Sequence, residues 1–147
     1  MEEHFGDAAR AVRERQPGES AVDAVRRQFL EMVAGRDPSV GLTPGRSPVR
    51  CARSCRRHRV LMERAFLAAQ KGTRELAELL AGDAGDRMLA TVAAASLSAA
   101  RDALIEEHHR RLAAGETPEQ VAADAAERAR AAFGLVENGL KDYAVRA

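Results

Sequence analysis

The residue types best suited to chemistry gather in one short stretch, as Cys51, Cys55, His58 and Met62. Their steps of four, three and four residues place these side chains within about 60° of one another on an α-helix. Thiolate and imidazole groups bind zinc or copper, so one interpretation is a metal or redox site. The favoured interpretation is the core face of a helix, because the same face continues into Phe66 and free cysteine packs as a small apolar residue. We therefore predict neither a metal nor a cofactor, with ligation by Cys51, Cys55 and His58 left open as the alternative.

Two charged runs are better explained as protein surface than as chemistry. Residues 46–59 contain six arginines and no acidic residue, which suits phosphate or an acidic partner, but no aromatic side chain is interleaved to stack on bases. We favour a solvated helix face for this run. In the run EEHHRR, Glu106 and Arg110, like Glu107 and Arg111, have the spacing of ion pairs on a helix surface. No nucleophile with a neighbouring base and no glycine-rich phosphate loop is found, so we do not expect an enzyme.

The composition favours an all-α protein. Of 147 residues, 46% are hydrophobic, many of them alanine, and only 3% are aromatic, and few stretches alternate as strands do. This length suits one domain over residues 1–147. A net charge of +1 gives no field that would attract nucleic acid or a membrane. The acidic N-terminus lacks the apolar core of a signal peptide, and two cysteines fit a reducing cytoplasm, so we expect a cytoplasmic protein.

Periodicity and end signals predict a bundle of about five to six helices. Thr117, Pro118 and Gln120 form a capping box, the most specific local pattern in the chain. A loop rich in proline and glycine is expected at 35–48, and Gly72 is expected to end or bend a helix. The expected helices lie at about residues 2–15, 20–35, 48–70, 73–82, 86–113 and 117–140.

Residues 88–100, MLATVAAASLSAA, differ from the other helical stretches. They carry no charge and are apolar or small on every side, so this helix is expected to be buried all round. Thirteen residues are too few to cross a bilayer, which needs about 20. We therefore expect a central helix with one side toward its own core and another toward a partner chain.

Four segments, in their order along the chain, carry a resemblance to a known family. They are RQPGESAVDAVRRQFLEMVAGRDP, RRHRVLMERAFLAAQ, GDRMLATVAAASLSAARDAL and TPEQVAADAAERARAAFGLVENGL. Over about residues 1–141 the chain resembles the C-terminal regulatory domain of TetR-type transcriptional regulators. The resemblance implies an all-helical homodimer in which the helices at 86–113 and 117–140 pair with the same two helices of a partner, as a four-helix bundle.

The resemblance also implies a function. Such regulators are repressors that bind a small, often apolar molecule inside the helical body, and binding shifts their DNA-reading heads and releases the operator. The chain does not show the helix-turn-helix domain with which those regulators begin, so DNA binding is expected only through such an N-terminal domain. The alternative is a helical interaction module that forms dimers or mixed dimers with other regulators without a small-molecule ligand.

Pockets of this family share no fixed residues, so the candidate site residues come from the periodicity of this sequence. The expected ligand-binding residues are Phe29, Met32, His58, Met62 and Phe66. The expected dimer interface consists of Val92, Ala95, Ala99, Val121, Ala125, Ala132 and Val136.

Overall fold

The computed structural model describes residues 7–43 and 55–139, except for the side chains of residues 55–58, 61 and 62. Within these ranges the chain forms five α-helices and one short 3-10 helix, with no strand, which confirms the all-α prediction. The elements are α1 (Asp7–Arg13), α2 (Ala21–Ala34), η1 (Pro38–Val40), α3 (Cys55–Ala84), α4 (Arg87–Ala113) and α5 (Pro118–Asn138).

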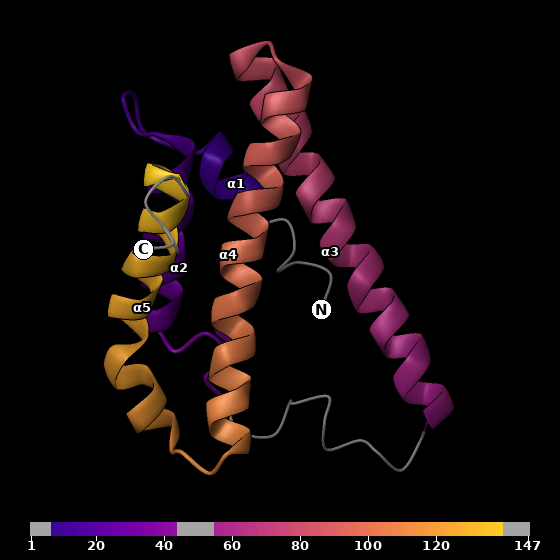
Figure 1. Ribbon diagram of the computed structural model, residues 1–147, viewed down its shortest axis with the longest axis vertical. Coiled ribbons are helices and arrows are strands. Elements are labelled where there is room, and N and C mark those ends of the chain that lie inside the picture. Colours follow the sequence, from indigo (N-terminus) through magenta and orange to yellow (C-terminus); the bar gives the residue numbers. More distant parts are fainter. Residues whose placement is uncertain (1–6, 44–54, 140–147) are drawn as a thin grey trace, which may run out of the picture.

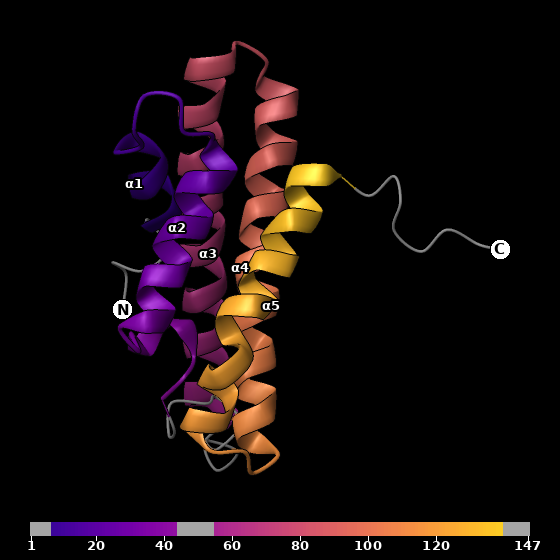
Figure 2. The same ribbon diagram turned by 90° about the vertical axis from the view of Figure 1, so that its left-hand side faces the viewer.

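Helix α4 is the central element of the arrangement (Figure 1). Helices α3 and α4 form a long antiparallel pair, and α5 turns back along another side of α4. Helix α2 packs on α5 and also touches α4, whereas the short α1 lies against α2 and α3. Figure 2 shows α2 and α5 side by side in front of α3 and α4. The N-terminal part of α3 diverges from α4, while its C-terminal part stays beside α4 (Figure 1).

Two phenylalanines form the centre of the core. Phe29 of α2 and Phe133 of α5 are both fully buried, and their rings meet edge to face with centroids 5.9 Å apart. This contact joins α2 to α5 and so fixes which side of α5 faces inward. Around the two rings lie small and medium-sized apolar side chains, which let the helices approach closely. The fully buried ones include Val12, Ala24, Val25, Leu76, Ala94, Val121, Ala125 and Ala129.

Side chains cap the helices where the sequence indicates helix starts. Ser20 Oγ accepts the backbone N–H of Asp23 at the start of α2, and Asp86 accepts a backbone N–H from the first turn of α4. At α5, Thr117 Oγ1 accepts the backbone N–H of Gln120, whose side chain accepts the backbone N–H of Thr117. The predicted capping box is thus confirmed. Each of these contacts satisfies an N–H group that the helix itself leaves unpaired.

Gly72 does not end a helix, so this half of the prediction made for it is wrong. Helix α3 passes through this position, so the two pieces predicted at 48–70 and 73–82 are one helix. Glycine inside a helix costs about 1 kcal/mol relative to alanine. Gly72 is buried, and the packing of the residues around it outweighs that cost. The predicted start at residue 48 lies outside the described residues.

Within the single chain that the structure describes, the central helix is buried on one side only. The predicted cover of its other side by a partner chain stays a prediction. The buried residues of α4 recur on one face, and the opposite face is exposed. Of the apolar 18-residue stretch within α4, only 28% is buried inside the chain. The reason is that the described helices flank α4 on its inner sides and leave the outer side uncovered. The buried residues of α4 are Ala90, Ala94, Leu97, Leu104 and His108.

Candidate interaction surface and ligand-site residues

The first half of α4 presents apolar side chains to solvent. Met88 is 63% exposed and Val92 is 55% exposed, and Ala95 and Ala99 continue the same face at steps of three and four residues. We call Met88, Val92, Ala95 and Ala99 the outer face of α4. Three of the residues predicted for a dimer interface therefore lie together on this face. A contiguous exposed apolar surface of this kind is typical of an interaction site.

The four predicted interface residues of α5 lie elsewhere. Ala132 and Val136 are half-buried against the chain's own core. Val121 and Ala125 are completely buried by the chain's own helices, so they have no surface left to offer a partner. The structure does not support their placement at an interface. The apolar stripe of α5 faces α2 and α4 within the same chain, and periodicity alone does not distinguish that from a stripe that faces a second copy.

Of the five predicted ligand residues, the three whose side chains are described do not all lie together. Phe29 is buried in the core between α2 and α5, and Met32 is partly buried against the same core. Phe66 lies on α3 and is 63% exposed. His58 and Met62 also lie on α3, but their side chains lie outside the described part of the chain. Because α2 packs on α1 and α5 whereas α3 packs on α4 and α1, the described side chains of Phe29 and Met32 lie in different surroundings from Phe66.

A groove of about 800 Å³ lies between α2 and α5. Charged side chains line it over a partly apolar floor, and none of the five predicted ligand residues belongs to it. Most of these charges are already paired within the chain, for instance Arg26 with Glu137 and Arg36 with Glu119. This open, charged groove does not match the apolar interior pocket that the resemblance implies. Its lining includes Arg26, Arg27, Arg36, Arg130, Leu30 and Val33.

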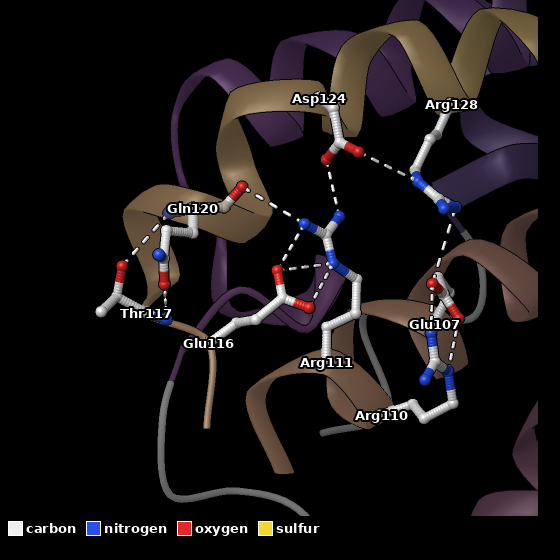
Figure 3. Close-up of polar contacts among 8 residues, drawn as sticks. All are labelled: Glu107, Arg110, Arg111, Glu116, Thr117, Gln120, Asp124 and Arg128. Carbon is white, nitrogen blue, oxygen red and sulfur yellow. Dashed lines mark hydrogen bonds and ion pairs between the residues drawn. The ribbon is translucent and has the colours of Figure 1, made fainter. Parts of the chain in front are cut away.

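Arg111 of α4 holds the turn that joins α4 to α5 (Figure 3). Its guanidinium donates hydrogen bonds to Glu116 in the turn and to Asp124 in α5, each at 2.6 Å. Arg128 of α5 donates to the other oxygen of Asp124 at 3.2 Å. Charge-assisted bonds from one arginine to two carboxylates fix geometry as well as charge. They therefore orient α5 on α4.

The ion pairs predicted for the run EEHHRR have different partners in the structure. Glu107 pairs with Arg110, at 2.7 Å and three residues away, rather than with Arg111. Arg111 turns instead toward Glu116 beyond the helix end. Glu106 is exposed and makes no ion pair with a described residue. The spacing identifies residues that can pair on a helix, but the turn after α4 supplies a second carboxylate that the spacing does not take into account.

The contacts of Arg111 with Glu116 and Asp124, which we call the α4–α5 junction, make the free energy of unfolding depend on pH in the acid range. Hydrogen bonds from Arg111 hold the pKa of Glu116 below 4.5 and that of Asp124 below 3.8, their ordinary values. A carboxyl whose pKa is lower in the folded state stabilises the fold above its unfolded pKa, and this contribution is lost as the pH falls through the folded pKa. We therefore expect the free energy of unfolding to decrease once the pH is lowered past about 4.5, and to decrease less in Arg111→Met than in the wild type. Urea unfolding measured at several pH values from 7 to 3 tests this.

The control for this experiment is Arg74→Met. Arg74 is an exposed arginine of α3 that makes no ion pair with the described residues. Its pH profile should match that of the wild type. If Arg111→Met also followed the wild-type profile, the junction would not be the source of the acid sensitivity.

Arg101 and His108 are polar residues on the inner side of α4 that the predicted sites do not include. Both continue the buried stripe of Leu97 and Leu104 at steps of three and four residues. The sequence signal for these two residues is a polar side chain at a position of the helix where the neighbouring positions on the same side are apolar. His108 is completely buried, and its Nδ1 lies 2.7 Å from the Val40 carbonyl oxygen. Since a carbonyl oxygen can only accept a hydrogen bond, Nδ1 carries the hydrogen and donates it. This bond ties η1 to α4.

By its fold, the protein is an all-α helical bundle. Comparisons with protein-family models, with curated proteins and with solved structures found no match. The resemblance to TetR-type regulators therefore enters below as a proposal.

Two further findings bear on partners. Within residues 7–43 and 55–139, α4 is long and apolar enough to cross a membrane by length and composition, with a mean hydropathy of 1.4 over 18 residues. The core helix of a water-soluble protein passes the same test. No group of three or more His, Cys, Asp or Glu side chains placed to hold a metal is found among the described residues. Cys51 and the side chains of Cys55 and His58, the alternative metal ligands, lie outside those residues.

Proposed function

We propose that this chain is the ligand-sensing and dimerisation domain of a TetR-like transcriptional regulator, with DNA binding supplied by a helix-turn-helix segment. The observation that supports dimerisation is the outer face of α4, where Met88 and Val92 are more than half exposed beside Ala95 and Ala99. Apolar surface gains roughly 25 cal/mol per Å² when it leaves water. The same face of a second copy provides that burial, and the two alanines let the helices approach closely.

The residues of the outer face favour one register for such a pair. Beyond Ala99 the exposed face continues to Asp102 and Glu106, again at steps of three and four residues. In an antiparallel pair with two-fold symmetry, each contact occurs twice with its partners exchanged. Ala95 then lies opposite the partner's Ala99, Met88 opposite the aliphatic stem of the partner's Glu106, and Val92 opposite the partner's Asp102. Small side chains meet at the crossing point, where the two backbones are closest.

Ala95→Glu should convert the dimer into monomers. Pairing would bury two copies of an unpaired carboxylate at the crossing point, a cost of several kcal/mol that weakens the dimer by at least about 100-fold. Ala99→Glu should act in the same way, because Ala99 lies opposite Ala95 in the antiparallel pair. Sedimentation equilibrium over a range of protein concentrations measures the dissociation constant.

Ala123→Glu is the matched control for both variants. Ala123 is an exposed alanine inside α5, away from the outer face of α4, so the same change there should leave the dimer intact. A wild-type protein that stays monomeric at high concentration, or an Ala95→Glu protein that remains dimeric, would contradict the proposal. Flotation of a monomeric wild type with phosphatidylcholine vesicles would instead assign the outer face of α4 to a membrane.

A second candidate function is a helical interaction module that pairs with other regulators and binds no small molecule. The observation that favours it is the separation of Phe29, which is buried between α2 and α5, from Phe66, which is exposed on α3. Co-expression with a differently tagged TetR-type regulator tests it. Mixed dimers that form through α4 and are abolished by Ala95→Glu, in a protein whose unfolding midpoint no small molecule shifts, would favour this function over the first.

A further inference from the structure

Arg101 places a positive charge on the inner side of α4 without a complete set of partners. Its Nε is shielded from solvent, and no described residue accepts a hydrogen bond from it. The carboxylates that act on it are Asp7 and Asp102. Asp7 Oδ1 accepts a hydrogen bond from Arg10 at 2.9 Å, and Asp102 is an exposed residue. Burial lowers the pKa of the Arg101 guanidinium, which is the direction expected where a cation loses water and gains little in return.

Arg101 lies about one turn beyond a contact between α3 and α4. Thr73 Oγ1 donates to Ser98 Oγ at 2.9 Å, so these sides of α3 and α4 face each other. Arg101 follows Ser98 by about one turn, and Phe66 precedes Thr73 by about two turns, on the same sides of their helices. Because the helices are antiparallel, both steps lead toward the N-terminal part of α3, which diverges from α4 (Figure 1). Phe66 is 63% exposed.

We propose that Arg101 and Phe66 form the ligand site of this domain, and that the ligand is a small amphipathic carboxylate. The carboxylate accepts two hydrogen bonds from the Arg101 guanidinium, and the apolar chain lies on the Phe66 ring. This inference rests on the proposed ligand-sensing function and gives that ligand its chemical class.

A carboxylate fits this site better than a phosphate does. A phosphate carries up to two negative charges and needs more than one cation to replace its water. Arg10, the other cation near Asp7, already forms an ion pair with it. One carboxylate neutralises one guanidinium. Since α4 carries both Arg101 and the outer face, a ligand at this site acts directly on the helix that pairs with a partner.

The experiment uses octanoate as the probe and 1-octanol as its uncharged match. Octanoate, but not 1-octanol, should raise the thermal unfolding midpoint of the wild type, because it binds the folded state selectively. Arg101→Met should weaken octanoate binding by about 10- to 100-fold, the usual effect of losing hydrogen bonds to a charged group. Phe66→Ala should weaken it by a smaller factor. Arg74→Met, which changes an exposed arginine of α3 that lines no described groove, should bind octanoate as the wild type does.

Arg101→Met should also change the thermal stability of the protein in the absence of ligand. Replacing a partly buried, incompletely paired charge by an apolar side chain of similar length should raise the unfolding midpoint of the ligand-free protein. A lowered midpoint would show that Arg101 is a structural partner of Asp7 and would overturn the proposal. Equal octanoate shifts in Arg101→Met and wild type, or no shift in the wild type, would overturn it as well.

The oligomeric state of the same samples separates this inference from the proposed function. A dimer that does not bind octanoate contradicts the carboxylate site alone. A monomer contradicts the dimerisation function, whether or not it binds octanoate.

Discussion

Replacing Phe133 by alanine should lower the free energy of unfolding by about 3–5 kcal/mol, the largest effect expected of a single substitution here. The Phe133 ring is fully buried and meets the Phe29 ring edge to face at 5.9 Å. Truncation removes most of an aromatic side chain and leaves a cavity that the neighbouring alanines are too small to fill. Urea unfolding followed by circular dichroism measures the change.

Phe66→Ala is the control for this prediction. The same chemical change at a residue that is 63% exposed should alter the free energy of unfolding by less than about 0.5 kcal/mol in the absence of ligand. Comparable losses in the two variants would mean that Phe133 is not at the centre of the core.

Gly41→Ala should be the next most damaging substitution, at about 2–3 kcal/mol. Gly41 follows η1 with φ +76°, a left-handed conformation that L-amino acids with side chains rarely adopt. An added Cβ would also lie 2.9 Å from His109 Nε2 and 3.1 Å from the Ile105 carbonyl oxygen. The backbone carbonyl cannot move without distorting α4. The substitution should therefore push η1 away from the helix, and thermal unfolding measures the cost.

Gly18→Ala separates the two causes. Gly18 has a similar φ of +84°, but an added Cβ there would meet no atom within 4 Å. Its loss should reflect the backbone conformation alone, about 1–2 kcal/mol. If Gly41→Ala cost no more than Gly18→Ala, the close approach of η1 to α4 would not contribute to stability.

The fold class and several helix ends could be predicted from the sequence because their causes are local. Thr117 and Gln120 satisfy each other's backbone N–H groups within four residues of chain, so the capping box needs no knowledge of the rest of the fold. The same holds for Ser20 and Asp86 at the starts of α2 and α4. Alanine-rich composition with few aromatic residues then leaves little besides a helical bundle.

Packing partners could not be predicted in the same way. Periodicity gives the apolar side of a helix but not the helix that covers it, so Phe29 and Phe66 fall in different surroundings and Val121 faces inward rather than toward a partner. Because residues 88–100 of α4 are apolar or small on every side, their sequence does not indicate which side of the helix is left uncovered by the other helices. At Gly72, tertiary packing outweighs a local preference that favours a break.

The shortest α-helix among the described residues affects how the interior of the fold is reached. Helix α1 has seven residues, five of them buried, and two turns of helix are not stable alone in water. Its conformation therefore depends on contacts with α2 and α3, and it detaches at a lower free-energy cost than the long helices do. Because α1 packs on α2 and α3, such local unfolding exposes the sides of these two helices that α1 covers. Entry to the interior is then governed by the least stable segment of the fold, while the remaining helices stay assembled.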